Sequence, residues 1–119
     1  MDRQPYLKPI EQQFAVDTPL DLRQVGLSAT AVIQHRRERE RRYIWVVGEG
    51  AGPPLGELTG HGQTAPGEIA VSGSRTLTLS VPGGTVGPGR WLCQLAVVVR
   101  DRPQRMVPTD PARLKLTEP

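Results

Sequence analysis

The segment 75–101 constrains the fold more than any other part of the chain, because it reads as two β-strands joined by a corner. Polar and apolar residues alternate over 76–81, and a period of two is typical of a half-buried strand. The apolar members of this stretch share one face: Leu77, Leu79 and Val81. Glycine and proline interrupt the pattern at 82–89, and a longer strand rich in β-branched residues follows. The segment predicts a sheet corner and offers no polar constellation for catalysis.

Further short strands follow from the same alternation. The pattern is strongest at 27–35, where Leu27, Ala29, Ala31 and Ile33 fall on one face. The other expected strands lie at 12–16, 43–47, 55–59, 68–71, 105–107 and 114–117. Since 13 Gly and 12 Pro disfavour long helices, we expect an all-β sandwich or barrel of about seven to nine short strands.

A length of 119 residues fits one domain. We expect 1–16 to form an N-terminal arm and an edge strand, with Phe14 and Val16 turned inward. The sandwich domain would then span 17–117. Within it, 48–67 reads as a long loop rich in glycine and proline, with one short strand inside it.

The most prominent polar feature is the charged run 35–42. It contains five arginines: Arg36, Arg37, Arg39, Arg41 and Arg42. The run can be a solvated hairpin tip, a contact with another protein, or a contact with nucleic-acid phosphates. The interleaved Glu38 and Glu40 weaken the local positive field, which argues against nucleic acid as the partner.

Residues that could support catalysis or bind a metal are few. Cys93 is the sole cysteine, so an intrachain disulfide is excluded, and its apolar strand predicts a buried thiol that packs as a small hydrophobe. No base that could form a thiolate lies beside it in the sequence. His35 and His61 stand without further ligands at metal-binding spacing. We therefore expect no enzyme activity, no metal and no cofactor.

Trp91 has an expected structural role. It follows the corner and shares a face with Cys93. Sandwich domains often place an aromatic residue here, which ties the incoming connection to the next strand. The indole N–H of Trp91 can supply that bond.

Targeting features are absent from the sequence as given. The first residues lack the apolar run of a signal peptide, and no stretch is long and apolar enough to cross a membrane. The net charge of +3 is only mildly basic. We expect a chain that is made and assembled in a cytoplasm, with no membrane partner.

A family resemblance rests on the corner and the strand after it. The sequence 82–101, Pro-Gly-Gly-Thr-Val-Gly-Pro-Gly-Arg-Trp-Leu-Cys-Gln-Leu-Ala-Val-Val-Val-Arg-Asp, resembles small Ig-like domains of tailed-bacteriophage virion proteins, including the N-terminal module of baseplate upper proteins. The turn at 17–22 also looks like their early turn, and the likeness spans about 17–116. Two departures are Trp91 at a corner where Tyr is usual, and the length of the loop 48–67.

The resemblance implies an Ig-like Greek-key β-sandwich with extended terminal arms. It also implies a non-enzymatic structural component of a virion, in the tail, baseplate, neck or capsid surface, assembled in the host cytoplasm. Its partners would be other virion proteins and further copies of itself. Candidate contacts are the five arginines of the charged run together with Pro5, Tyr6 and Pro9 of the arm. The alternative is a stand-alone binding module that recognises carbohydrate or a host surface through Tyr43, Trp45 and the long loop.

Overall fold

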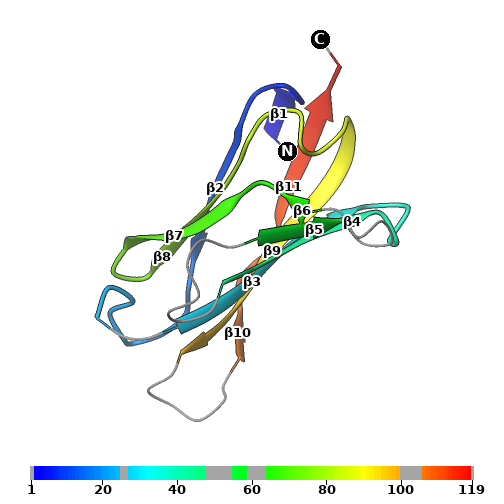
Figure 1. Cartoon of the computed structure of the whole chain (residues 1–119). Helices are drawn as coiled ribbons and strands as arrows, with labels where there is room; N and C mark the ends of the chain where they lie inside the picture. Colours follow the sequence, from blue (N-terminus) through cyan, green and yellow to red (C-terminus); the bar gives the residue numbers. More distant parts are fainter. Residues whose placement is uncertain (1, 25–26, 48–54, 59–63, 100–105, 119) are drawn as a thin grey trace.

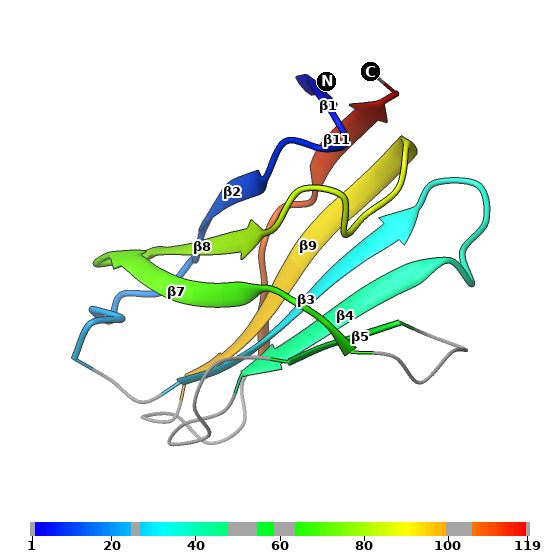
Figure 2. The same cartoon turned by 45° about the horizontal axis from the view of Figure 1, so that its top comes forward.

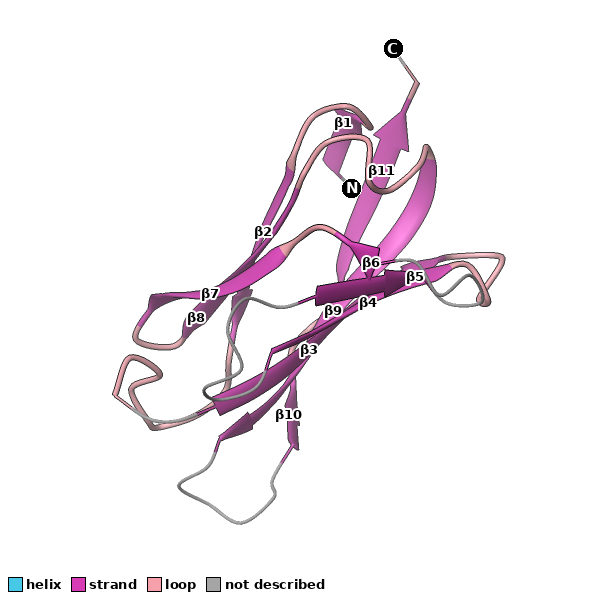
Figure 3. Ribbon diagram, viewed as in Figure 1, coloured by secondary structure: helices cyan, strands magenta, loops and turns pink. Residues whose placement is uncertain are grey.

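Strands and connecting loops make up the described part of the chain, and no helix occurs there (Figure 3). The computed structural model describes residues 2–24, 27–47, 55–58, 64–99 and 106–118. In chain order the strands are β1 (Asp2–Pro5), β2 (Ile10–Ala15), β3 (Leu27–His35), β4 (Arg42–Val47), β5 (Leu55–Leu58), β6 (Thr64–Ala65), β7 (Glu68–Gly73), β8 (Thr76–Val81), β9 (Gly89–Val99), β10 (Met106–Pro108) and β11 (Ala112–Thr117) (Figure 1). The all-β prediction is confirmed.

Most of these strands coincide with the alternating segments of the sequence. Only β1 and β6 were not expected, and they are four and two residues long. The strand expected inside the loop 48–67 is β5. The parts of that loop at 48–54 and 59–63, which include His61, lie outside the described residues.

The strands form two sheets. The large sheet has the order β1-β11-β9-β3-β4-β5-β6, with β10 also paired to β9, and the small sheet has the order β2-β8-β7. The pairing of β1 with β11 is parallel, and the other pairs are antiparallel. The small sheet lies over one face of the large sheet (Figure 2).

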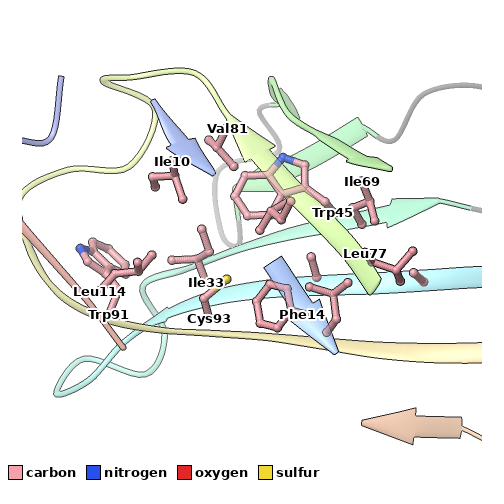
Figure 4. Close-up of a cluster of buried hydrophobic side chains, with 14 of the residues drawn as sticks. Ile10, Phe14, Ile33, Trp45, Ile69, Leu77, Val81, Trp91, Cys93 and Leu114 are labelled. Atoms are coloured by element: carbon pink, nitrogen blue, oxygen red, sulfur yellow. The ribbon is translucent and has the colours of Figure 1, made fainter. Parts of the chain in front are cut away.

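The core lies between the sheets and follows the period-two pattern. From the small sheet it takes Ile10, Phe14, Leu77, Leu79 and Val81, and from the large sheet it takes Ala31, Ile33, Trp45, Trp91, Cys93, Leu95 and Val97, among others (Figure 4). Because successive side chains of a strand point to opposite faces, one set of residues from each strand is removed from water. The expected inward faces at 27–35 and 76–81 are therefore confirmed.

The connection from β8 to β9 passes from the small sheet to the large one, and Trp91 holds it in place. The buried indole Nε1 of Trp91 donates a hydrogen bond to the Gly87 carbonyl oxygen at 3.0 Å. Gly89, at the start of β9, has φ +142°, a conformation that L side chains rarely adopt. The structural role expected for Trp91 is confirmed.

The segment 1–16, expected as an arm and an edge strand, contains two strands of this chain's own sheets. β1 pairs with β11, and β2 lies at an edge of the small sheet. Between them the Tyr6 amide donates to the Thr117 carbonyl at 2.9 Å, and the Gly84 amide donates to the Tyr6 carbonyl at 2.8 Å. A Cβ at Gly83 would collide with the Leu7 carbonyl oxygen, so a glycine is needed for this close approach. Residues 2–9 are thus tied to the last strand and to the β8–β9 corner.

Candidate functional site

The charged run forms the tip of the β3–β4 hairpin. The His35 amide donates to the Arg41 carbonyl at 2.9 Å, and the Arg41 amide donates to the Glu38 carbonyl, also at 2.9 Å, which closes the turn. The side chains from Arg36 to Arg42 are exposed. The interpretation of this run as a hairpin tip is confirmed.

The tip is fixed on the buried ring of Trp91. His35 meets Trp91 edge-on with ring centroids 5.0 Å apart, and the Arg41 guanidinium lies 5.4 Å from the centroid of the same ring. The Nδ1 atom of His35 accepts hydrogen bonds from the amides of Arg37 and Glu38, at 3.2 and 3.0 Å. The backbone that carries the arginines is therefore held in one conformation by contacts with the corner of the sandwich.

Strand pairing brings further cations beside this tip. Arg3 of β1 is opposite Lys115 of β11, and Lys115 is opposite Arg90 of β9. The Arg36 amide donates to the Arg90 carbonyl at 3.0 Å, so Arg36 extends the same cross-strand row. Because paired residues share a face, the row lies on the outer face of the large sheet, away from the core.

A second cross-strand row on the same face runs parallel to the first, at the next outward-facing position of each strand. It joins Arg113 to Leu92, Leu92 to Gln34, and Gln34 to Arg42. The cations of the two rows and Arg37 of the tip together form a surface that we call the cationic band: Arg3, Arg36, Arg37, Arg42, Arg90, Arg113 and Lys115. The ion pairs in the described part of the chain are Arg23–Asp21 and Arg41–Glu38, at 2.9 and 3.1 Å, and neither includes a member of the band.

A hollow lies within the band. It has a volume of about 380 Å³ and is lined by His35, Arg36, Arg37 and Arg90. Three of its four lining residues are arginines, so the hollow is a candidate site for an oxyanion, because guanidinium donors match the geometry of carboxylate and phosphate oxygens.

Apolar side chains occupy the same outer face next to the band. We call them the apolar rows: Val32 of β3, Ile44 and Val46 of β4, and Leu92, Ala96 and Val98 of β9. Val46 is 55% exposed, and the others are half-buried. The register places Val32 opposite Ile44 and also opposite Gln94, and Thr30 lies between Val46 and Ala96, so apolar and polar side chains are interspersed across these three strands.

Comparisons with known proteins find no match for this chain. Neither models of protein families, nor curated proteins, nor solved structures give a significant match. The assignment of a function therefore depends on the surfaces described here.

The three candidate contacts of the N-terminal segment lie apart from one another. Pro5 is exposed at the edge of the large sheet, opposite Thr117 and two residues beyond Arg3 of the band. Tyr6 is half-buried and packs against the core. Pro9 lines a different hollow, of about 470 Å³, at the end of the small sheet, together with Glu11 and Glu68. Of these three residues, only Pro5 adjoins the cationic band.

The charged run 35–42 predicted the arginines of the tip, whereas Arg3, Arg90, Arg113 and Lys115 were not predicted. Arg3 and Arg90 each lie singly in a strand, Arg113 and Lys115 both lie in β11, and no local pattern marks the four as a group. Their outward parity could be read from the alternation. The alternation does not show that β1, β11 and β9 are adjacent in the sheet, because this order depends on pairing between distant segments.

Other reactive groups in the described part of the chain are few. Burial raises the pKa of the Cys93 thiol to about 12, so the sulfur stays protonated and its expected role as a buried hydrophobe is confirmed. Among the described residues, no three or more His, Cys, Asp and Glu side chains lie together as a metal ion would require. None of the described segments forms a helix that could span a membrane.

Proposed function

We propose that this chain is a non-enzymatic structural component of a tailed-phage virion, with an Ig-like fold, and that it acts through subunit assembly. The strand order supports the Ig-like assignment. The order β11-β9-β3-β4-β5 corresponds to the sheet of strands G, F, C, C′ and C″ in a variable-type Ig domain, and β2-β8-β7 corresponds to strands B, E and D.

The corner residue supports the same assignment. In Ig domains a tyrosine two positions before the cysteine of strand F bonds back to the chain a few residues upstream. Trp91 lies two positions before Cys93, and its N–H reaches the carbonyl of Gly87, four residues upstream. The tryptophan thus makes the bond that tyrosine makes in those domains.

The observation that carries the assembly role is the outer face of the large sheet. It combines the apolar rows with seven cations that have no ion-pair partner in the described part of the chain. Partly exposed apolar side chains beside charged groups are typical of a surface that another protein covers. The partners would be other virion proteins and further copies of this chain, in a particle assembled in the host cytoplasm.

The alternative of a carbohydrate-binding module loses the aromatic residues on which it depended. Trp45 and Trp91 are fully buried, and Tyr43 is half-buried against them, with its ring 6.0 Å from Trp45 and 5.8 Å from Trp91. Side chains packed in the core cannot stack on a sugar ring. We therefore favour assembly.

Detection of the protein in particles tests this role. An antiserum raised against the purified chain would be used to label particles of the phage that encodes it. We expect gold label at one fixed place on the particle and a constant amount of protein per particle by mass spectrometry. Protein found in the lysate but absent from purified particles would contradict the virion role.

A further inference from the structure

We propose that the cationic band is the docking site for an acidic surface of a partner protein, one of whose carboxylates enters the hollow between Arg36, Arg37 and Arg90. This inference rests on the proposed assembly function and adds the chemistry of the partner. It follows from the pairing of like charges, the fixed backbone of the hollow, and the apolar rows beside the band.

Like charges lie opposite one another within the band. Arg3, Lys115 and Arg90 occupy directly opposite positions on three neighbouring strands. Strands lie about 4.8 Å apart, and like charges directly opposite one another destabilise a sheet. A row of acidic groups on a partner would offset this repulsion and attract the cations. The electrostatic energy of the band is therefore unfavourable in the free protein and favourable in the complex.

The backbone around the hollow is ordered before any partner binds. The backbone of Arg36 is bonded to that of Arg90, and the Arg37 amide is bonded to His35. The ring of His35 in turn packs on the buried Trp91. The guanidinium groups therefore extend from a backbone that does not have to be ordered on binding, which lowers the entropic cost of forming bonds to a carboxylate.

The apolar rows beside the band favour a protein partner over nucleic acid. The apolar rows adjoin the band on the same face, and Leu92 lies within the second cationic row between Arg113 and Gln34. A protein surface can cover such residues with apolar side chains of its own. Single-stranded nucleic acid is usually bound on exposed aromatic side chains, and both tryptophans of this chain are buried in the core.

The experiment measures binding of two labelled peptides of equal length by fluorescence anisotropy. One peptide is poly-L-glutamate, and the other alternates glutamate with valine. The variant Arg36→Glu/Arg90→Glu reverses charges at the hollow. The control Arg75→Glu/Arg23→Glu makes the same change in net charge away from the band. A third variant, Val32→Thr/Ile44→Thr, alters the apolar rows and leaves the charges in place.

We expect both peptides to bind, with affinity that falls as salt is raised. The hollow variant should weaken binding at least about tenfold, and the control should change it much less. The alternating peptide should bind more tightly than poly-L-glutamate, although it carries half the charge, and Val32→Thr/Ile44→Thr should abolish that gain. Circular dichroism of each variant establishes that it is folded.

Four results would overturn the inference. In the first, neither peptide binds; in the second, the hollow variant and the control lose the same amount of affinity. In the third, a mixed-sequence DNA duplex binds more tightly than the alternating peptide at about 0.15 M salt. In the fourth, light scattering shows self-association that the hollow variant abolishes. The last two would assign the face to nucleic acid or to a second copy. If the particles are labelled with gold but neither peptide binds, the virion role stands and the docking site is wrong. If the peptides bind but the particles are not labelled, the docking site stands and the virion role is wrong.

Discussion

The outer faces of the two sheets differ in the charged and apolar side chains that they expose. On the small sheet, Ser72, Thr76 and Thr78 bond to one another through their hydroxyl groups, at 3.3 and 2.9 Å. On the large sheet, the cationic band has no ion pair in the described part of the chain, and Val46 is more than half exposed. Both faces come from the same period-two pattern and enclose the same core. The outward residues alone therefore distinguish the two faces, and we propose a partner surface only on the large sheet.

The largest expected effects test which residues point inward. Leu79→Ala and Val97→Ala remove fully buried side chains from the small and the large sheet, and each should lower the free energy of unfolding by about 2–4 kcal/mol. The matched outward changes Leu92→Ala and Val46→Ala should cost less than about 1 kcal/mol. Urea unfolding measures all four, and equal costs for inward and outward positions would mean that the register is displaced by one residue.

A smaller effect is expected at the corner that joins the two sheets. Trp91→Phe keeps an aromatic ring but removes the N–H that bonds to the Gly87 carbonyl. The loss should be about 1–3 kcal/mol, because a hydrogen bond and part of a buried ring disappear together. Thermal unfolding checks this value. An unchanged melting temperature would show that the bond does not hold the corner.

The buried thiol gives the stability of the folded chain a dependence on pH. The pKa of Cys93 is about 12 in the folded chain and 9.0 as its reference value. Above pH 9 the unfolded chain releases a proton that the folded chain keeps, so stability should fall as pH rises, by at most about 1.4 kcal/mol per pH unit. Cys93→Ala should remove this part of the slope in urea unfolding measured from pH 8 to about pH 10.5. Identical slopes for the two proteins would contradict a raised pKa.

The smallest effect tests the repulsion within the cationic band. Lys115→Glu places an acid between Arg3 and Arg90 and should stabilise the free protein by about 0.2–1 kcal/mol at low salt. The gain should shrink as salt is added. On the small sheet, Ser80→Lys between Glu11 and Glu68 is the matching change of opposite sign and should act in the same direction. Destabilisation by Lys115→Glu at low salt would mean that the row does not repel.

Local patterns in the sequence predicted much of the fold. The alternation at 27–35 and 76–81 gave the strands and their inward faces, because burial on one side of a sheet requires a period of two. The glycine and proline tract predicted the corner, and the position of Trp91 predicted its bond. The short strand β1 was not predicted, since four residues with a proline at the end carry no alternation, and its partner β11 lies at the other end of the chain.

The candidate site could be predicted only in part for the same reason. The arginines of the hairpin tip are adjacent in the sequence and were found as a run. Arg3, Arg90 and Lys115 form a row only because β1, β11 and β9 are neighbours in the large sheet. Strand parity is a local property, whereas strand order depends on contacts between distant segments, which one sequence does not reveal.

Protection of a single position on each outer face would test the central claim most directly. In a Cys93→Ala background, Val46→Cys places a thiol in the apolar rows, and Gln13→Cys places one on the exposed outer face of the small sheet. Labelling with a maleimide would be timed in the free protein and in purified particles. We predict that Val46→Cys reacts readily in the free protein and slowly in the particle, while Gln13→Cys reacts at similar rates in both. Equal rates for Val46→Cys in the two states would contradict the claim that the large-sheet face is covered on assembly.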